Sequence, residues 1–249
     1  MRPTLLLAHG FPLDSTLWAG TRAALQDMAD VVTPDLRGFG ADHREVPNVL
    51  SMELLAQDLA HLLDERGVHR VVVGGSSMGG YVALAFAERW PDRVQALVLC
   101  NTRSTADTLE GRQARLATAA GAVSRGTSVI ARGMAPKLLA PGTRRDRPDL
   151  VTEVLAMMER QRPEAVAAAS LGMAARPDRT AVLSRLKVPV LIITGESDEL
   201  MPLPTSAVMK MAATNGRLVV LPGAGHLSHL EQPEAFHRAM RDFLVGLSP

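Results

Sequence analysis

Cysteine is almost absent from this sequence. Cys100 is the single thiol among 249 residues, so an intrachain disulfide is excluded. Cys100 ends an apolar run that begins at Val94, and we expect it to pack in the core. A strong charge of either sign is also lacking, because the formal net charge is +1. A net charge this small gives no indication that the protein binds nucleic acid or an anionic membrane.

Long hydrophobic segments are lacking as well. No run approaches the roughly 18 apolar residues of a membrane span. The start of the chain, MRPTLLLAHG, lacks the apolar core and the small-residue cleavage site of a secretory signal. We therefore expect a cytoplasmic protein without a membrane partner. Cysteine and histidine spacings typical of metal sites are missing too, so we expect neither a metal nor an organic cofactor.

What the sequence does contain is an alternation of short β-rich runs and longer helical patterns. Several runs consist almost entirely of valine, isoleucine and leucine, which suits strands buried on both faces of a parallel sheet. The predicted strands cover residues 4–8, 31–33, 70–74, 94–99, 190–194 and 217–221. The predicted helices cover residues 51–66, 78–89, 203–213 and 231–245. This order predicts a doubly wound α/β fold.

One long stretch interrupts the alternation. Residues 103–186 contain no convincing strand and are rich in alanine, arginine and methionine, with several prolines as breaks. A structureless loop of that length is uncommon inside a compact domain. We therefore interpret residues 103–186 as a helical cap, inserted into an α/β core that residues 1–102 and 187–249 form.

The strongest chemical signal lies where the third predicted strand meets a helix. Gly75, Ser77 and Gly79 form the pattern G-x-S-x-G between the strand and the helix, which is the context that gives this pattern its meaning. A sharp turn there lifts the serine hydroxyl into the open, and glycine on both sides avoids collisions of Cβ atoms. Ser76 does not fit, because only one of its own flanking positions is glycine. The pattern predicts Ser77 as a nucleophile.

A serine hydroxyl needs a neighbouring base, and seven histidines are available. His226 lies in a glycine-rich loop after the last predicted strand, where α/β sheets place residues that contact ligands. His229 lies three residues later and is the alternative. The residues alone favour His226 but leave His229 open.

The base in turn needs a carboxylate that fixes its tautomer. Asp198 follows the strand predicted at residues 190–194, and Glu196 and Glu199 are nearby alternatives. Asp107 or Asp178 could serve only with a different loop path. The chain order of Ser77, then Asp198, then the histidine favours Asp198, because it is the order that accompanies a G-x-S-x-G turn, unlike the orders of the two well-known serine protease folds.

Attack on a carbonyl also requires N–H donors for the oxyanion that forms. The N–H of Met78, directly after the nucleophile, is one candidate donor. The second is expected in the loop after the first strand, and we assign it to the N–H of Phe11. His9 precedes this loop, and we interpret it as a residue that braces the loop.

Taken together, the chain resembles the α/β-hydrolase superfamily from His9 to its C-terminus. The matching stretches are HGFPLDSTLW, DLRGFG, GGSSMGG, PVLIITGESD and GAGHLSHLEQPEAF. The resemblance implies that Asp198 and His226 are the catalytic acid and base. The stretch at residues 173–191 looks most like small carboxylesterases and 3-oxoadipate enol-lactonases.

The chain departs from the usual superfamily pattern at its start. Members usually carry two strands before the strand that leads to the His-Gly pair, which here arrives at residue nine. We therefore expect about six strands, mostly parallel, with residues 31–33 towards an exposed edge. An exposed edge can pair with another chain, so a homodimer formed there is a hypothesis.

The resemblance implies a hydrolase that cleaves a small carboxylic ester or lactone through an acyl-enzyme on Ser77. The same triad could serve a C–C bond, thioester or amide hydrolase or a perhydrolase, and a non-catalytic ligand receptor is a further alternative. The cap is expected to shape the substrate pocket. Its candidate lining residues are Trp18, Met134, Met157 and Met173, with Arg144 and Arg176 as candidates for holding a substrate carboxylate.

Overall fold

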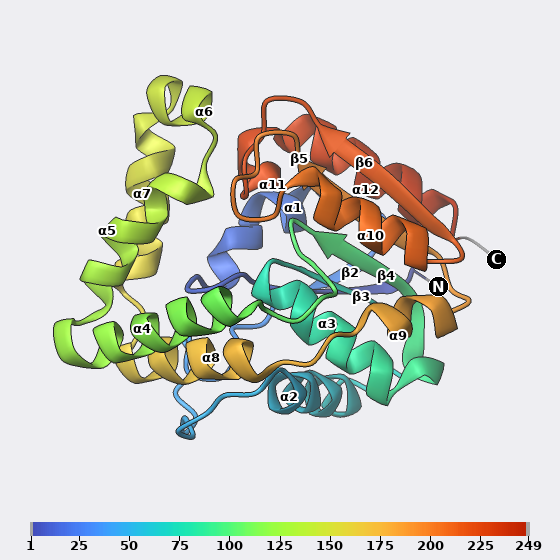
Figure 1. Cartoon of the computed structure of the whole chain (residues 1–249). Helices are drawn as coiled ribbons and strands as arrows, with labels where there is room; N and C mark the ends of the chain where they lie inside the picture. The colour runs from blue at the N-terminus through green and yellow to red at the C-terminus, as the bar shows by residue number, and fades with distance from the viewer. Residues whose placement is uncertain (1, 248–249) are drawn as a thin grey trace.

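A six-stranded sheet runs through the centre of the computed structural model, which describes residues 2–247 (Figure 1). The strands lie in the order β2-β1-β3-β4-β5-β6, and every neighbouring pair is parallel. Their bounds are β1 Thr4–Ala8, β2 Asp30–Val32, β3 Val71–Ser76, β4 Val94–Cys100, β5 Val190–Gly195 and β6 Gly216–Leu221. The six strands predicted from the sequence are confirmed.

Strand β2 forms one edge of the sheet, as predicted for residues 31–33. Within residues 2–247 it pairs only with β1, so its outer backbone groups have no neighbouring strand. Dimerisation through this edge stays a prediction.

Helices cover both faces of the sheet because successive side chains of each strand point to opposite sides. Leu5 and Leu7 of β1 pack in the cluster on the side of α1 (Ala19–Leu25) and α12 (Pro233–Val245). Leu6 and Ala8 pack in the cluster on the other side. The helices on that second side are α2 (Met52–Glu65), α3 (Met78–Arg89) and α10 (Leu203–Ala212).

Capping side chains and proline set several helix ends. The Ser51 side chain accepts a hydrogen bond from the N–H of Leu54 at 3.1 Å and so begins α2. The helix predicted at residues 231–245 is α12, which begins at Pro233, and the short α11 (Ser228–Glu231) precedes it. Pro233 explains this start, because proline fits the first turn of a helix but cannot continue one. Two short 3-10 helices, η1 (Ser15–Trp18) and η2 (Pro91–Arg93), complete the connections.

Six helices separate β4 from β5. They are α4 (Leu109–Arg125), α5 (Thr127–Leu138), α6 (Pro141–Asp146), α7 (Pro148–Glu159), α8 (Pro163–Ala175) and α9 (Thr180–Arg185). Helix α4 packs along α8, and α5 packs along α7, so these four form a connected group to one side of the sheet (Figure 1). Helix α9 instead packs against α10 and α3. The exact division into core and cap stays a prediction.

Two simpler expectations concern the core and the membrane. Cys100 is fully buried at the end of β4, as expected for a core thiol. Among residues 2–247, no helix combines the length and the apolar character needed to cross a membrane.

Candidate active site

Ser77 occupies the sharp turn between β3 and α3. Its φ of 53° is rare for a residue with a side chain, so the surrounding structure must hold it there. The glycines on either side make this possible. A Cβ atom on Gly79 would overlap the carbonyl oxygen of Ala8, and one on Gly75 would come within 2.5 Å of the Gly79 carbonyl carbon. The G-x-S-x-G pattern is therefore a steric requirement of this turn.

Asp198 and His226 form a buried hydrogen-bonded pair. His226 Nδ1 lies 2.9 Å and 3.0 Å from the two carboxylate oxygens of Asp198. The same carboxylate accepts hydrogen bonds from the N–H groups of Leu200 and Met201 and from Asn101 Nδ2, each at 2.9 Å. Burial alone would raise the pKa of Asp198, but the His226 imidazole and these hydrogen bonds outweigh it and keep this pKa below its ordinary value. Asp198 is therefore an anion at neutral pH.

Three consecutive residues at the end of β4 connect this pair to the serine turn. Cys100 accepts a hydrogen bond from the N–H of Ser77 at 2.9 Å. Asn101 donates to Asp198, and the Thr102 hydroxyl donates to the backbone oxygen of Ser77 at 2.7 Å. Within the described residues the Ser77 hydroxyl itself makes no hydrogen bond. Hydrogen bonds of catalytic groups are often long without substrate and tighten when it binds.

Asn101 was not selected from the sequence, yet it contacts several parts of the site. Its side-chain oxygen accepts a hydrogen bond from the Ser228 hydroxyl at 2.6 Å, and its Nδ2 also donates to the Gly225 oxygen at 3.1 Å. Its φ of 45° turns the chain sharply after β4. The available signal was a polar residue directly after a buried strand, at the sheet edge where ligand sites form.

Two backbone donors near Ser77 have no partner. Phe11 is buried, and its N–H finds no acceptor among residues 2–247. Met78 is the first residue of α3, so its N–H has no acceptor within the helix. The loop that contains Phe11 lies against the serine, because a Cβ atom on Gly10 would be 3.5 Å from Ser77 Cβ. Unpaired buried N–H groups are rare in folded proteins, and this position suits an oxyanion.

His9 braces the same loop, as interpreted from the sequence. Its Nε2 accepts a hydrogen bond from the N–H of Leu36 at 3.0 Å, and its Nδ1 lies 2.9 Å from the Gly10 oxygen. A neutral ring protonated at Nδ1 satisfies both contacts. Burial lowers the pKa of His9, which favours this neutral form.

The alternative base and acids lie in different surroundings. His229 is buried and stacks on Trp18, with ring centroids 4.4 Å apart. Burial lowers the pKa of His229 to about 3, and the backbone of Leu17 opposes this shift only in part. Glu196 and Glu199 are exposed, and the carboxylate in contact with the imidazole of His226 is that of Asp198. The structure thus brings together Asp198 and His226 rather than their alternatives.

A cavity of about 440 Å³ opens beside Ser77, and Phe11, Met134 and Met173 are among its lining residues. Most of the other lining residues belong to α4 and α5. Helices of the inserted segment therefore contribute to the same cavity as Ser77.

Four residues expected at the substrate do not line this cavity. Trp18 is fully buried in its stack with a histidine ring, and Met157 is buried among the core side chains of α7. Arg176 is already paired within the protein, because its guanidinium group donates a hydrogen bond to Asp107 at 2.8 Å. Arg144 lies in α6, which contributes no residue to the lining. The sequence could not foresee these placements, because each depends on how the inserted helices pack.

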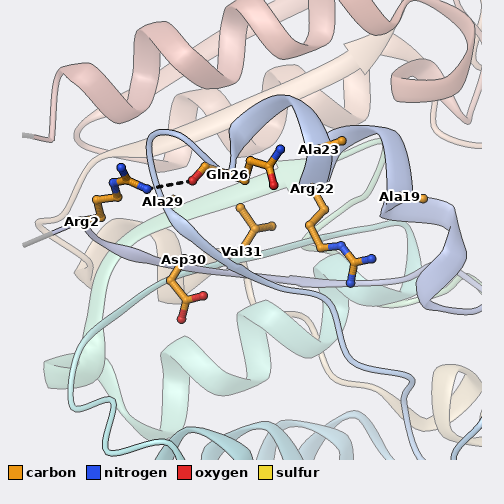
Figure 2. Close-up of a pocket in the computed structure, with 8 residues that line it drawn as sticks. All are labelled: Arg2, Ala19, Arg22, Ala23, Gln26, Ala29, Asp30 and Val31. Carbon is orange, nitrogen blue, oxygen red and sulfur yellow. Dashed lines mark hydrogen bonds between the residues drawn. The ribbon is translucent and has the colours of Figure 1, made fainter.

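A larger hollow, of about 520 Å³, lies at the β2 edge of the molecule (Figure 2). Figure 2 shows Arg2, Arg22 and Asp30 around it, with Arg2 hydrogen-bonded to the backbone oxygen of Gln26. Its lining contains no serine, cysteine or histidine. This hollow therefore offers no nucleophile of the kind found at Ser77. Residues 2–247 also contain no cluster of three or more side chains suited to hold a metal ion.

Comparisons with known proteins agree with this geometry. A family model described as alpha/beta hydrolase fold matches residues 3–233. The 3-oxoadipate enol-lactonase 2 of Acinetobacter baylyi is 28% identical over 239 residues, which cover 96% of this chain and 87% of that protein.

Solved structures show the same likeness. A thermophilic esterase from Thermogutta terrifontis, with malate bound, has a TM-score of 0.96 and 40% identity and covers 100% of this chain and 92% of that one. The enol-lactonase from Burkholderia xenovorans LB400 has a TM-score of 0.90 and 27% identity, with 98% and 92% covered.

Proposed function

This chain belongs to the α/β-hydrolase family, as its motifs predicted, and on that premise we propose that it hydrolyses small carboxylic esters or lactones through an acyl-enzyme on Ser77. The main support is the buried hydrogen bond between Asp198 and His226, which the end of β4 connects to the serine turn. The relatives named as an enol-lactonase and an esterase support esters and lactones as substrates.

The proposed first half of the reaction forms the acyl-enzyme. Asp198 accepts a hydrogen bond from the Nδ1–H of His226, so the imidazole presents its lone pair at Nε2. Nε2 takes the proton of the Ser77 hydroxyl while the serine oxygen bonds to the carbonyl carbon. The N–H groups of Phe11 and Met78 stabilise the negative charge on the carbonyl oxygen. The bond to the leaving oxygen then breaks, and His226 gives its proton to that oxygen.

The second half releases the acid. His226 takes a proton from water while the water oxygen bonds to the acyl carbon. The bond to the Ser77 oxygen breaks, and the proton returns from His226 to that oxygen. The net change adds one water across the ester bond, and with a lactone both new groups remain in one product.

The experiment that tests this proposal compares p-nitrophenyl esters and lactones as substrates for the wild type, Ser77→Ala and Ser76→Ala. We expect Ser77→Ala to reduce kcat by about 10⁴-fold or more. Ser76 provides a matched control, because its buried hydroxyl has no hydrogen-bond partner to lose. Turnover that persists in Ser77→Ala contradicts the assignment. Binding of these compounds without any turnover by the wild type would instead indicate a ligand receptor.

Adding thioester, amide and C–C bond substrates to the panel separates the chemistries that share this triad. Thioester, amide or C–C bond substrates that are turned over faster than every ester would displace the proposed substrate class. A cytoplasmic location and the expected lack of nucleic-acid and membrane partners remain predictions of the sequence.

A further inference from the structure

The cavity beside Ser77 carries an excess of positive charge. Among its lining residues, Arg103, Arg115, Arg125 and Lys137 are cationic, and Asp107 is the one acid. Arg125 and Lys137 are exposed, whereas Arg103 and Arg115 are half-buried. Which of these charges are already balanced decides what the cavity can bind.

Asp107, the one acid among the lining residues, is already paired with two neighbouring arginines. Asp107 accepts a hydrogen bond from the buried Arg176 at 2.8 Å, and its second oxygen lies 3.4 Å from Arg115 Nε. Burial would raise the pKa of Asp107, but these two arginines outweigh it and hold the pKa below its ordinary value. Arg176 also lies over the ring of Tyr81, 3.9 Å from its centroid. Asp107 therefore stays ionised and cannot balance the remaining cations.

Arg103 has no acidic partner within residues 2–247. Its Nη2 donates to the Leu200 oxygen at 2.8 Å, and its Nε donates to the Met201 sulfur at 3.0 Å. A thioether is a weak acceptor, and a guanidinium group has five N–H donors, so most of its hydrogen-bonding capacity is unused. Arg103 directly follows Thr102, which is hydrogen-bonded to the Ser77 backbone, so it is fixed next to the nucleophile turn.

We infer that the substrate carries a carboxylate on its acyl part and that Arg103 binds this carboxylate. This inference rests on the proposed function and adds a substrate class to it: short monoesters of dicarboxylic acids, or lactones that bear a carboxylate. A guanidinium group binds a carboxylate through two parallel hydrogen bonds, which would replace the weak contact with the Met201 sulfur. The exposed Arg125 and Lys137 add positive potential that attracts an anion into the cavity.

The cavity also suits the rest of such a molecule. Ile130, Met134 and Met173 supply apolar contacts for a short carbon chain. A volume of about 440 Å³ accommodates a small ester but restricts large ones. An uncharged ester of the same size makes the apolar contacts but leaves Arg103 without an anion.

The test compares monomethyl succinate with methyl succinamate, its uncharged isostere, by pH-stat titration of the acid or proton released. We expect the wild type to favour monomethyl succinate by about 10- to 100-fold in kcat/KM. In Arg103→Gln this ratio should fall close to one, and in Arg103→Lys it should take an intermediate value. The ratio within one variant is the measure, because Arg103 also holds the Leu200 loop and its loss could slow both substrates.

Arg112→Gln is the matched control. Arg112 is exposed on α4 and does not line the cavity, so the same change of charge should leave the ratio unchanged. A wild type without preference, or an unchanged preference in Arg103→Gln, overturns the inference. If the wild type hydrolyses both esters equally and Ser77→Ala hydrolyses neither, the proposed function stands while the inference fails.

A binding measurement covers the case in which neither ester is turned over. If the p-nitrophenyl esters and lactones are not hydrolysed either, the proposed function fails, and calorimetric titration with succinate tests the carboxylate site by itself. At least 10-fold weaker binding by Arg103→Gln than by Arg112→Gln supports the site. Equal affinities of these two variants for succinate overturn it.

Discussion

His229 is the alternative base that the sequence leaves open, and its surroundings lead to a prediction about acid stability. The ring is buried between Trp18 and Phe236, with centroid distances of 4.4 Å and 5.6 Å. Burial outweighs the backbone of Leu17, the one neighbour that favours the charged form, so a proton on this ring would be a buried charge with little compensation. Burial accordingly lowers the pKa of His229 from 6.5 to about 3.

The magnitude follows from the difference between the folded and unfolded states. A histidine in the unfolded chain gains a proton as the pH falls through about 6.5, whereas His229 in the folded protein gains it only near pH 3. The stabilisation is therefore complete above pH 6.5 and is lost as the pH falls towards 3. Linkage gives a loss of about 2 kcal/mol in the free energy of unfolding between pH 7 and pH 5, and about 3 kcal/mol by pH 4.

The perturbation that tests this is His229→Leu, because leucine is similar in volume and has no ionisable group. Urea denaturation at pH 5, 6, 7 and 8 measures the free energy of unfolding of both proteins. The loss between pH 7 and pH 5 should be about 2 kcal/mol smaller in the variant. His43→Gln removes an exposed histidine and should parallel the wild type. Esterase activity at pH 8 should persist in His229→Leu, because the residue does not line the cavity.

Two results would refute this reasoning. Parallel pH profiles for the wild type and His229→Leu would mean that the folded protein accepts the proton as readily as the unfolded chain. Loss of activity in a variant that still unfolds cooperatively at the same urea concentration would return His229 to the role of base.

Three further predictions concern the site and the assembly. Asp198→Asn should keep the fold but lower kcat by about 10⁴-fold, because an amide cannot fix the His226 tautomer; wild-type rates would contradict this. Glu231 accepts hydrogen bonds from the N–H groups of Ala140 and Gly225 at 2.8 Å and 2.9 Å, on different oxygens. Glu231→Gln leaves one of these buried donors unpaired and should lower the free energy of unfolding by about 1–3 kcal/mol in urea denaturation. Pairing through β2 should double the 26.6 kDa mass in light scattering, and a monomer at high concentration rejects it.

The nucleophile could be predicted from the sequence because its constraint is local. The turn requires glycine two residues before and after the serine, and the steric overlaps at Gly75 and Gly79 show why. The strands could be predicted as well, because strands that are buried on both faces must be apolar along their whole length. Choosing His226 over His229 was different: the residues alone left both open, and the contact with Asp198 spans a chain separation of 28 residues.

The substrate cavity could not be predicted residue by residue. Met134 and Met173 line it while Met157 does not, although all three lie in helices of the inserted segment. Helix α8 is apolar on all sides, so its sequence indicates burial but not which side chain faces Ser77. Those orientations follow from the packing of α8 along α4, which no pattern within either helix determines.

The role of each arginine also could not be predicted from the sequence, but the structure separates paired arginines from unpaired ones. Arg176, one of the two arginines proposed from the sequence to hold a carboxylate, is paired with Asp107, which lies 69 positions away. Arg103 was not selected, because nothing in the sequence distinguishes an arginine just after a strand from an arginine on the surface. The pairing inside the fold distinguishes them: the buried arginine is neutralised within the protein, and the arginine beside the nucleophile turn is not. A cation without an internal partner, next to a nucleophile, is the position where an anion supplied by the substrate has the most to contribute.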